Sequence, residues 1–86
     1  MMIVYVYINS WEIDSGECGE VIKVFSHLED ALNVLKEDMI EARQNMEGLE
    51  TEETDYVEGD FSWSIWQKGE YCYNHVDLTI YQRAVC

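Results

Sequence analysis

The chain has 86 residues, enough for one hydrophobic core and too few for two, so the sequence predicts a single acidic domain over residues 1–86. Its 18 acidic and 5 basic residues give a formal net charge of −13, which disfavours contact with nucleic acid or anionic membranes and favours a basic protein partner. The three cysteines form no disulfide framework, and the N-terminus lacks both a signal-peptide pattern and a membrane-spanning run, so we expect a cytoplasmic protein.

The first predicted elements form a β-hairpin. Residues 3–8 (IVYVYI) are β-branched or aromatic without a polar break, which is typical of a strand covered on both faces, and we expect this strand to be central. Residues 9–19 are rich in Ser, Asp and Gly and predict a long acidic connection. Residues 21–25 then predict the second strand.

A helix is predicted over residues 27–47. Ser26 and Glu29 have the spacing of a capping box, in which both side chains bind free amides of the first turn. Gly48 is expected to end the helix in a left-handed conformation. Apolar residues at three- and four-residue steps form one stripe that should face the sheet: Leu28, Ala31, Leu32, Leu35, Met39, Ala42 and Met46. The opposite arc carries carboxylates: Glu29, Asp30, Glu37, Glu41 and Glu47.

The acidic residues are concentrated in one third of the chain. Residues 47–60 (EGLETEETDYVEGD) contain seven carboxylates and no basic group, which predicts a solvated linker or loop. Residues 26–58 together hold 11 of the 18 acidic residues. Charge that serves only solubility would be dispersed, so this clustering favours a binding role for the helix and the loop.

Two further strands are predicted around a turn at Lys68-Gly69. Residues 61–66 alternate between apolar and polar or exposed side chains, and residues 71–83 alternate again. A two-residue turn would place Trp63 opposite Asn74 and Ile65 opposite Cys72. The complete order predicts an α+β fold, a four-stranded and mainly antiparallel sheet with one helix on one face (ββαββ).

The sheet face without the helix is expected to be open and aromatic. An aromatic patch of that size is typical of an interface, so we expect a homodimer contact or a docking face there. Its predicted members are Trp66, Tyr71, Tyr73 and Tyr81, with Tyr5 and Tyr7 as further candidates.

No pattern predicts an enzyme, a cofactor or a metal site. Cys72 and His75 have the spacing of half a zinc site, which Cys18, His27 and Cys86 could complete, but strand alternation places Cys72 and His75 on opposite faces. The sequence contains no nucleophile elbow, zinc-protease motif or phosphate-binding loop. The acidic segment also lacks the ligand spacing of a calcium loop.

The opening YVYINSWEIDSGECGEVIKVFSHLEDALNVLKE resembles a type common among small uncharacterised bacterial and phage proteins. In these a strand, a short acidic loop, a second strand and a helix follow one another. The resemblance covers about the first 45 residues and implies a fold, not an activity. In size and charge the chain is also similar to small acidic phage proteins such as anti-CRISPRs and other DNA-mimic inhibitors, although no motif matches residue by residue.

Two functions remain open from the sequence. The first is an inhibitor that occupies the basic nucleic-acid-binding surface of a host defence protein, with carboxylates in place of phosphates and with Tyr56, Trp63 and Trp66 as aromatic anchors. The second is a small accessory or assembly protein that dimerises or docks through the aromatic sheet face. The carboxylates that the first function would use are Glu37, Glu41, Glu47, Glu50, Glu52, Glu53, Asp55 and Glu58.

Overall fold

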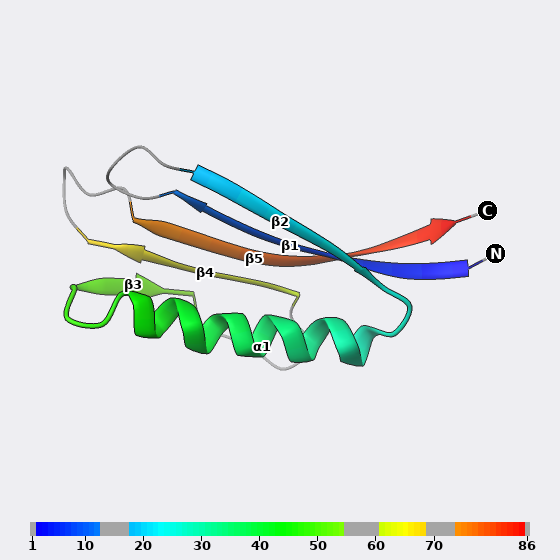
Figure 1. The fold of residues 1–86 in the computed structure, drawn as a ribbon, viewed down its shortest axis with the longest axis horizontal. Coiled ribbons are helices and arrows are strands. Elements are labelled where there is room, and N and C mark those ends of the chain that lie inside the picture. The colour runs from blue at the N-terminus through cyan, green and yellow to red at the C-terminus, as the bar shows by residue number, and fades with distance from the viewer. Residues whose placement is uncertain (1, 13–17, 55–60, 69–73, 86) are drawn as a thin grey trace.

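The computed structural model describes residues 2–12, 18–54, 61–68 and 74–85. These residues form one helix and a five-stranded antiparallel sheet with the strand order β2-β1-β5-β4-β3 (Figure 1). The predicted α+β class with a single helix is confirmed, and the predicted number of four strands is wrong. The elements in chain order are β1 (Met2–Glu12), β2 (Cys18–Phe25), α1 (Leu28–Asn45), β3 (Thr51–Glu53), β4 (Ser62–Gln67) and β5 (His75–Val85).

The predicted hairpin at the start of the chain is confirmed, although both of its strands are longer than expected. β1 pairs with β2 from Tyr5 opposite Phe25 to Glu12 opposite Cys18. On its other side β1 pairs with β5 over its whole length, so the polar residues after position 8 continue the strand because they have backbone partners on both sides. The expectation that β1 is central is wrong, since β5 lies at the middle of the sheet.

The fifth strand lies inside the segment that the sequence predicts as a loop. Thr51–Glu53 form β3 at the edge of the sheet, with Glu52 opposite Trp66 and Glu53 opposite Ile65. Glutamate is a weak strand former, but pairing satisfies backbone groups along the edge of β4 and so overrides the local preference. The loop interpretation is therefore wrong for these three residues. It is confirmed for residues 47–50 and 54, which lie in neither helix nor strand, and residues 55–60 lie outside the described part.

The register between β4 and β5 differs from the predicted one by four residues. Trp63 lies opposite Leu78, and Ile65 lies opposite Val76. The backbone amide of Gln67 donates to the carbonyl of Asn74 at 2.9 Å, so the connection is longer than the two residues expected at Lys68-Gly69. Four is an even number, so each side chain keeps the sheet face that the alternation predicted.

Of the two signals predicted for the ends of the helix, the capping box at its start is wrong and the glycine after its end is confirmed. His27 is the N-cap in an extended conformation and makes no side-chain capping bond, so the box expected from Ser26 and Glu29 does not form. The helix starts one residue too late for Ser26 to reach the amides of the first turn. At the other end Gly48 has a φ of 88°, the left-handed conformation that was expected.

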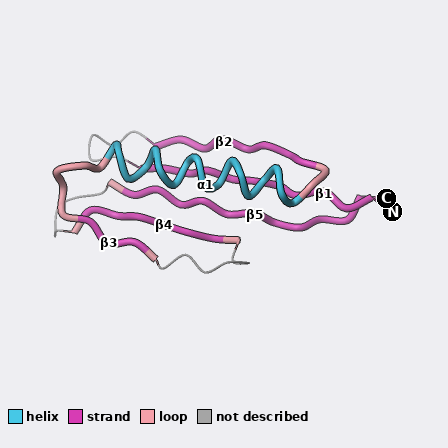
Figure 2. The backbone as a smooth tube through the Cα atoms, turned by 90° about the horizontal axis from the view of Figure 1, so that it is seen from below, coloured by secondary structure: helices cyan, strands magenta, loops and turns pink. Residues whose placement is uncertain are grey.

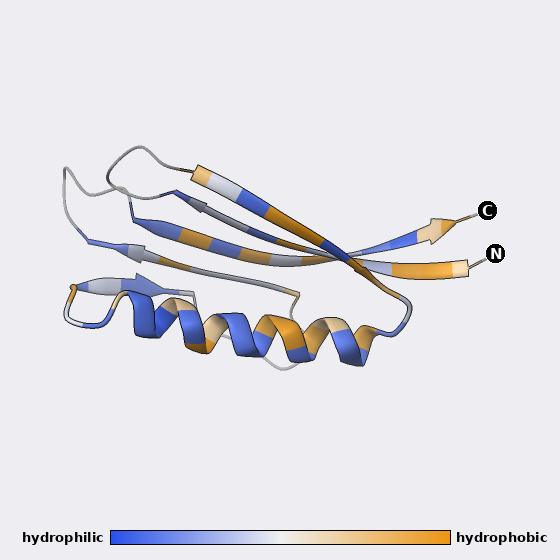
Figure 3. Ribbon diagram, viewed as in Figure 1, coloured by the Kyte–Doolittle hydropathy of each residue, from blue (hydrophilic) through white to orange (hydrophobic). Residues whose placement is uncertain are grey.

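The core lies between α1 and the face of the sheet that it covers (Figures 2 and 3). The predicted apolar stripe of the helix is confirmed, because its central residues are buried and Leu28 and Leu32 pack against them. Tyr7 is fully buried and Tyr5 packs on the same core, so their expected place on the open face is wrong. Strand alternation puts these two tyrosines on the helix side. The buried set is Tyr7, Ala31, Leu35, Met39, Ala42, Met46, Trp63, Ile65, Leu78 and Ile80.

The molecule is elongated, with extents of 46 × 26 × 17 Å. Its radius of gyration is 14.0 Å, against about 12 Å for a compact domain of this length. Part of the difference is a ribbon at one end, where Met2–Val4 pair with β5 alone and both chain ends project (Figure 1). Among the described residues, α1 covers one face of this sheet and no helix or strand covers the other.

Candidate binding surfaces

Exposed carboxylates of α1 and of the turn after it form the first candidate surface. We call Glu37, Glu41, Glu47 and Glu50 the outer acidic surface, and all four are exposed as the sequence predicts. Glu29 and Asp30 are also exposed, in the first turn of α1, where negative charge interacts favourably with the helix dipole. Glu47 and Glu50 have no such compensation from the helix, because they follow its C-terminal end, which is the negative end of the dipole.

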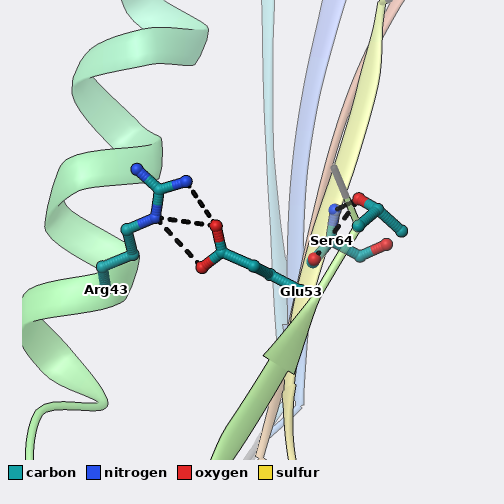
Figure 4. Close-up of polar contacts among 4 residues, drawn as sticks. Arg43, Glu53 and Ser64 are labelled. Carbon is teal, nitrogen blue, oxygen red and sulfur yellow. Dashed lines mark hydrogen bonds and ion pairs between the residues drawn. The ribbon is translucent and has the colours of Figure 1, made fainter. Parts of the chain in front are cut away.

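Glu53 is separated from the outer acidic surface by an ion pair within the domain. Arg43 of α1 reaches over to β3, where its Nε donates to the Glu53 Oε1 and Oε2 at 3.1 and 3.0 Å and its Nη2 also binds Oε1 (Figure 4). The hydrogen bonds to Glu53 raise the pKa of the Arg43 guanidinium above its ordinary value. The guanidinium also lies 5.3 Å from the centre of the Trp63 ring. Glu53 therefore ties the helix to the sheet edge.

The remaining carboxylates of the predicted set do not extend the outer acidic surface. Glu52 faces the opposite side of β3 from Glu53, and its Oε1 lies 3.3 Å from Lys68 Nζ. Asp55 and Glu58 lie outside the described residues, as does the predicted anchor Tyr56. Of the eight predicted carboxylates, four are thus exposed on α1 and the turn after it, and Glu52 and Glu53 form ion pairs within the domain.

Trp63 cannot be an aromatic anchor, because only 1% of it is exposed. The strand alternation already assigns Trp63 to the apolar face of β4, and burial follows once α1 covers that face. Its indole Nε1 is buried and has no hydrogen-bond partner among the described residues. A buried donor of this kind costs about 1–3 kcal/mol, so the packing of the ring must offset it.

The sheet face away from α1, which we call the open sheet face, is more aliphatic than the sequence predicts. Trp66 is half-buried there, Tyr81 is 42% exposed, and Tyr71 and Tyr73 lie outside the described residues. Two aliphatic side chains of β2 on this face are instead more exposed than Tyr81, namely Ile22 (58%) and Val24 (62%). The segment VIKVF contained this signal, since its alternation separates Ile22 and Val24 from Lys23.

The open sheet face divides into an apolar half and a polar half. Val6 lies between Val24 and Tyr81, and Ile8 lies between Ile22 and Thr79. Toward the hairpin end the cross-strand rows change to polar groups, namely Glu20, Ser10 and Asp77, then Cys18, Glu12 and His75. An apolar half-face of this kind is a candidate protein interface.

A pocket of about 390 Å³ lies between the second half of α1 and the adjoining ends of β1 and β5. This volume falls within the range of small-molecule sites. Its lining combines an apolar floor with a rim of carboxylates and amides: Trp11, Ala42, Met46, Leu49 and Val76, with Asn9, Asp38, Glu41, Asn45 and Asn74.

Asp38 is held in this pocket by two donors from β1. The buried Tyr7 hydroxyl donates to Asp38 Oδ2 at 2.5 Å, and Asn9 Nδ2 donates to the same oxygen at 3.3 Å. Burial raises the pKa of Tyr7 well above its ordinary value, and the neighbouring Asp38 carboxylate raises it further. Sequence reasoning missed Asp38, although its place beside the apolar stripe of α1 would have indicated a carboxylate turned toward the sheet.

The Tyr7→Phe variant tests this hydrogen bond through the pH dependence of stability. We expect a loss of about 1–3 kcal/mol near neutral pH, because a hydrogen bond to a charged group is removed. Tyr7 stays protonated in the folded protein and ionises above about pH 10 when unfolded, so its contribution is complete below pH 10 and falls as the pH rises further. Urea unfolding should therefore show a shallower alkaline loss of stability in Tyr7→Phe than in the parent, with Tyr81→Phe as the exposed control.

The described residues contain neither a cluster of metal ligands nor a membrane-spanning helix. Within the described ranges, no three His, Cys, Asp or Glu side chains are grouped so that they could hold a metal ion. Cys18 is exposed, His75 Nε2 lies 3.2 Å from Asp77 Oδ1, and Cys72 and Cys86 lie outside the described part. The helix that the structure describes is not long and apolar enough to cross a bilayer.

Comparisons of the chain with protein-family models, curated proteins and solved structures find no match. The features that bear on function are therefore the outer acidic surface, the open sheet face and the pocket.

Proposed function

We propose that this protein is a non-catalytic inhibitor that binds the basic nucleic-acid-binding surface of another protein. The observation that carries the proposal is the outer acidic surface, four exposed glutamates of α1 and the turn after it in a chain with a net charge of −13. Glu37 and Glu41 are one helical turn apart, about 6 Å along the axis. This spacing is of the same order as the charge spacing of about 3.4 Å along one strand of DNA.

The class of partner follows from the same charges and from the resemblance in size and acidity to DNA-mimic inhibitors of phages. A host defence protein with a groove for nucleic acid, met in the cytoplasm, is the partner that we propose. Carboxylates would replace phosphates along that groove, and the counterions of both surfaces would be released on binding. Such complexes form by fast, electrostatically steered association that slows as salt is added.

The triple variant Glu37→Gln, Glu47→Gln and Glu50→Gln tests the role of the outer acidic surface. It removes three charges outside the pocket and leaves the ion pairs of Glu52 and Glu53 intact. With a basic nucleic-acid-binding protein captured by the parent as the immobilised partner, we expect the association rate at low salt to fall about tenfold and the dissociation rate to change less.

A control variant of equal charge separates local from overall electrostatics. Glu12→Gln, Glu20→Gln and Glu29→Gln also remove three exposed charges, but from the open sheet face and the start of the helix. This control should associate within about twofold of the parent rate. Equal slowing by both triple variants would assign the effect to net charge and would contradict the proposed role of the outer acidic surface.

The open sheet face favours a second candidate function, an assembly protein that pairs with a second copy of itself. Its apolar half leaves Ile22 and Val24 more than half exposed, with Val6 and Ile8 beside them. Face-to-face packing of two such sheets is a common way to bury an uncovered face. In this alternative the acidic residues maintain solubility, and self-association persists at high salt.

A further inference from the structure

We propose that the pocket between α1 and the ends of β1 and β5 binds an organic cation, a guanidinium or ammonium group carried on a short apolar stem. The same chemistry is offered by a free alkylguanidine and by an arginine side chain of a protein. If the ligand is an arginine side chain of the basic partner, this inference rests on the proposed function. If the ligand is a free cation, the inference does not depend on the proposed function.

The charge of the pocket excludes an anionic ligand. Asp38 and Glu41 lie one turn apart on α1, and both line the pocket. Its described lining contains no Lys, Arg or His. An anion would meet two carboxylates in a strongly acidic protein, whereas a cation would relieve the repulsion between them.

Asp38 has a fixed orientation and a free acceptor. The Tyr7 hydroxyl and the Asn9 amide both donate to Oδ2, which holds the carboxylate plane in place. Within the described part of the chain, no donor binds the other oxygen, Oδ1. Since Asp38 is half-buried and lines the pocket, Oδ1 can accept a charge-assisted hydrogen bond from a ligand that enters there.

Trp11 provides an aromatic wall, and Gly19 holds it in place. The two residues are directly opposite each other in the β1–β2 pairing, and the indole lies against the glycine. A Cβ added at Gly19 would come within 2.3 Å of Trp11 Cζ2, so only glycine leaves room for the ring. An indole beside two carboxylates is a recognised environment for an organic cation, because the ring face attracts positive charge.

The apolar floor distinguishes an organic cation from a metal ion. Ala42, Met46 and Val76 present hydrocarbon to the pocket, which suits the methylene stem of an alkylguanidine and gives a metal ion no ligands. The amide side chains of Asn9 and Asn45 add acceptors at the rim that a planar guanidinium can use.

Titration with small probes tests the proposal, with amide chemical shifts as the readout. We expect agmatine and N-acetyl-arginine methylamide to shift the resonances of Trp11 and Asp38, and N-acetyl-citrulline methylamide, which is neutral and nearly the same shape, to bind at least tenfold more weakly. N-butylguanidine, which carries one charge like the arginine derivative, is the matched free cation. Tighter binding of the arginine derivative than of N-butylguanidine would identify a protein side chain as the source of the cation, and the reverse order would identify a free cation.

Substitutions inside and outside the pocket test whether agmatine binds there. Asp38→Asn should weaken agmatine about tenfold, Glu41→Gln about threefold, and Trp11→Leu about fivefold. Glu37→Gln removes one charge from the outward side of the same helix, outside the pocket, and should change the affinity less than twofold. Because Glu41 is exposed, its variant remains informative should Asp38→Asn prove unstable.

The proposal is overturned if citrulline and arginine derivatives bind equally, or if Glu37→Gln weakens agmatine as much as Glu41→Gln does. Both results would show attraction to the overall charge or to apolar surface instead of recognition in the pocket. These results leave the proposed function standing, because the residues of its triple variant lie outside the pocket. Conversely, if the triple variant associates with the basic partner as fast as the parent does, the inhibitor proposal is contradicted. The binding of agmatine in the pocket is not affected by that result.

Discussion

The Leu35→Asp variant is expected to be unfolded at room temperature. Leu35 is fully buried in the cluster between α1 and the sheet. Its replacement removes a large apolar side chain from the core, at a cost of about 2–5 kcal/mol, and adds the cost of burying a carboxylate without a partner. A domain of this length has a free energy of unfolding of roughly 4–13 kcal/mol, so the combined loss should exceed or nearly exhaust it.

Circular dichroism during heating and urea titration would measure this effect. Ile40→Asp is the matched control, because Ile40 lies on the same helix but is 55% exposed and turned away from the sheet. We expect that control to unfold within about 1 kcal/mol of the parent. A cooperative, parent-like melt of Leu35→Asp would refute the packing of α1 on the sheet.

The double variant Ile22→Lys and Val24→Lys is expected to abolish any self-association. Both side chains lie in the apolar half of the open sheet face, on the edge strand β2. In a symmetric dimer each would be buried twice, so four unpartnered ammonium groups would enter the interface. Sedimentation should then give 10.1 kDa, the mass of one chain, at concentrations where the parent sediments as a dimer.

Val21→Lys is the control for this experiment. Val21 is on the same strand and 39% exposed, but it points to the helix side of the sheet. It should leave the dimer intact. A parent protein that sediments as a monomer at high concentration would remove the assembly function, and a double variant that remains dimeric would move the interface away from the open sheet face.

Periodicity alone predicted the parts of the fold that depend on a buried face. The apolar stripe of α1 and the alternation of β4 and β5 both survive, the latter even with the register displaced by four residues. The strand β3 could not be predicted in this way, because Glu52 and Glu53 adopt an extended conformation through pairing with β4. Their side chains form ion pairs with Lys68 and Arg43 respectively. These contacts join residues that are distant in the sequence, so no local pattern contains them.

For the candidate sites too, local sequence pattern predicted some features and contacts between distant segments determined the others. Exposure of the outer acidic surface follows from its place on the helix, and the sequence predicted it. The sequence did not predict the pocket. The pocket requires Trp11 to lie on Gly19, which depends on the register of the β1–β2 hairpin, and Asp38 to meet Tyr7, which depends on the packing of α1 on β1. Gly19 was interpreted as a turn residue, but it lies within β2, where glycine indicates the close approach of another group.

Displacement of nucleic acid from a captured partner is the most direct test of the proposed inhibition. A basic protein retained by this chain at low salt would be loaded with a fluorescent oligonucleotide, and the chain would be added in steps while anisotropy is recorded. The outer acidic surface predicts release of the oligonucleotide at a stoichiometry near one chain per binding site, with a competing affinity that falls steeply as salt rises. Anisotropy that rises on addition, because the chain and the oligonucleotide bind the partner together, would contradict it.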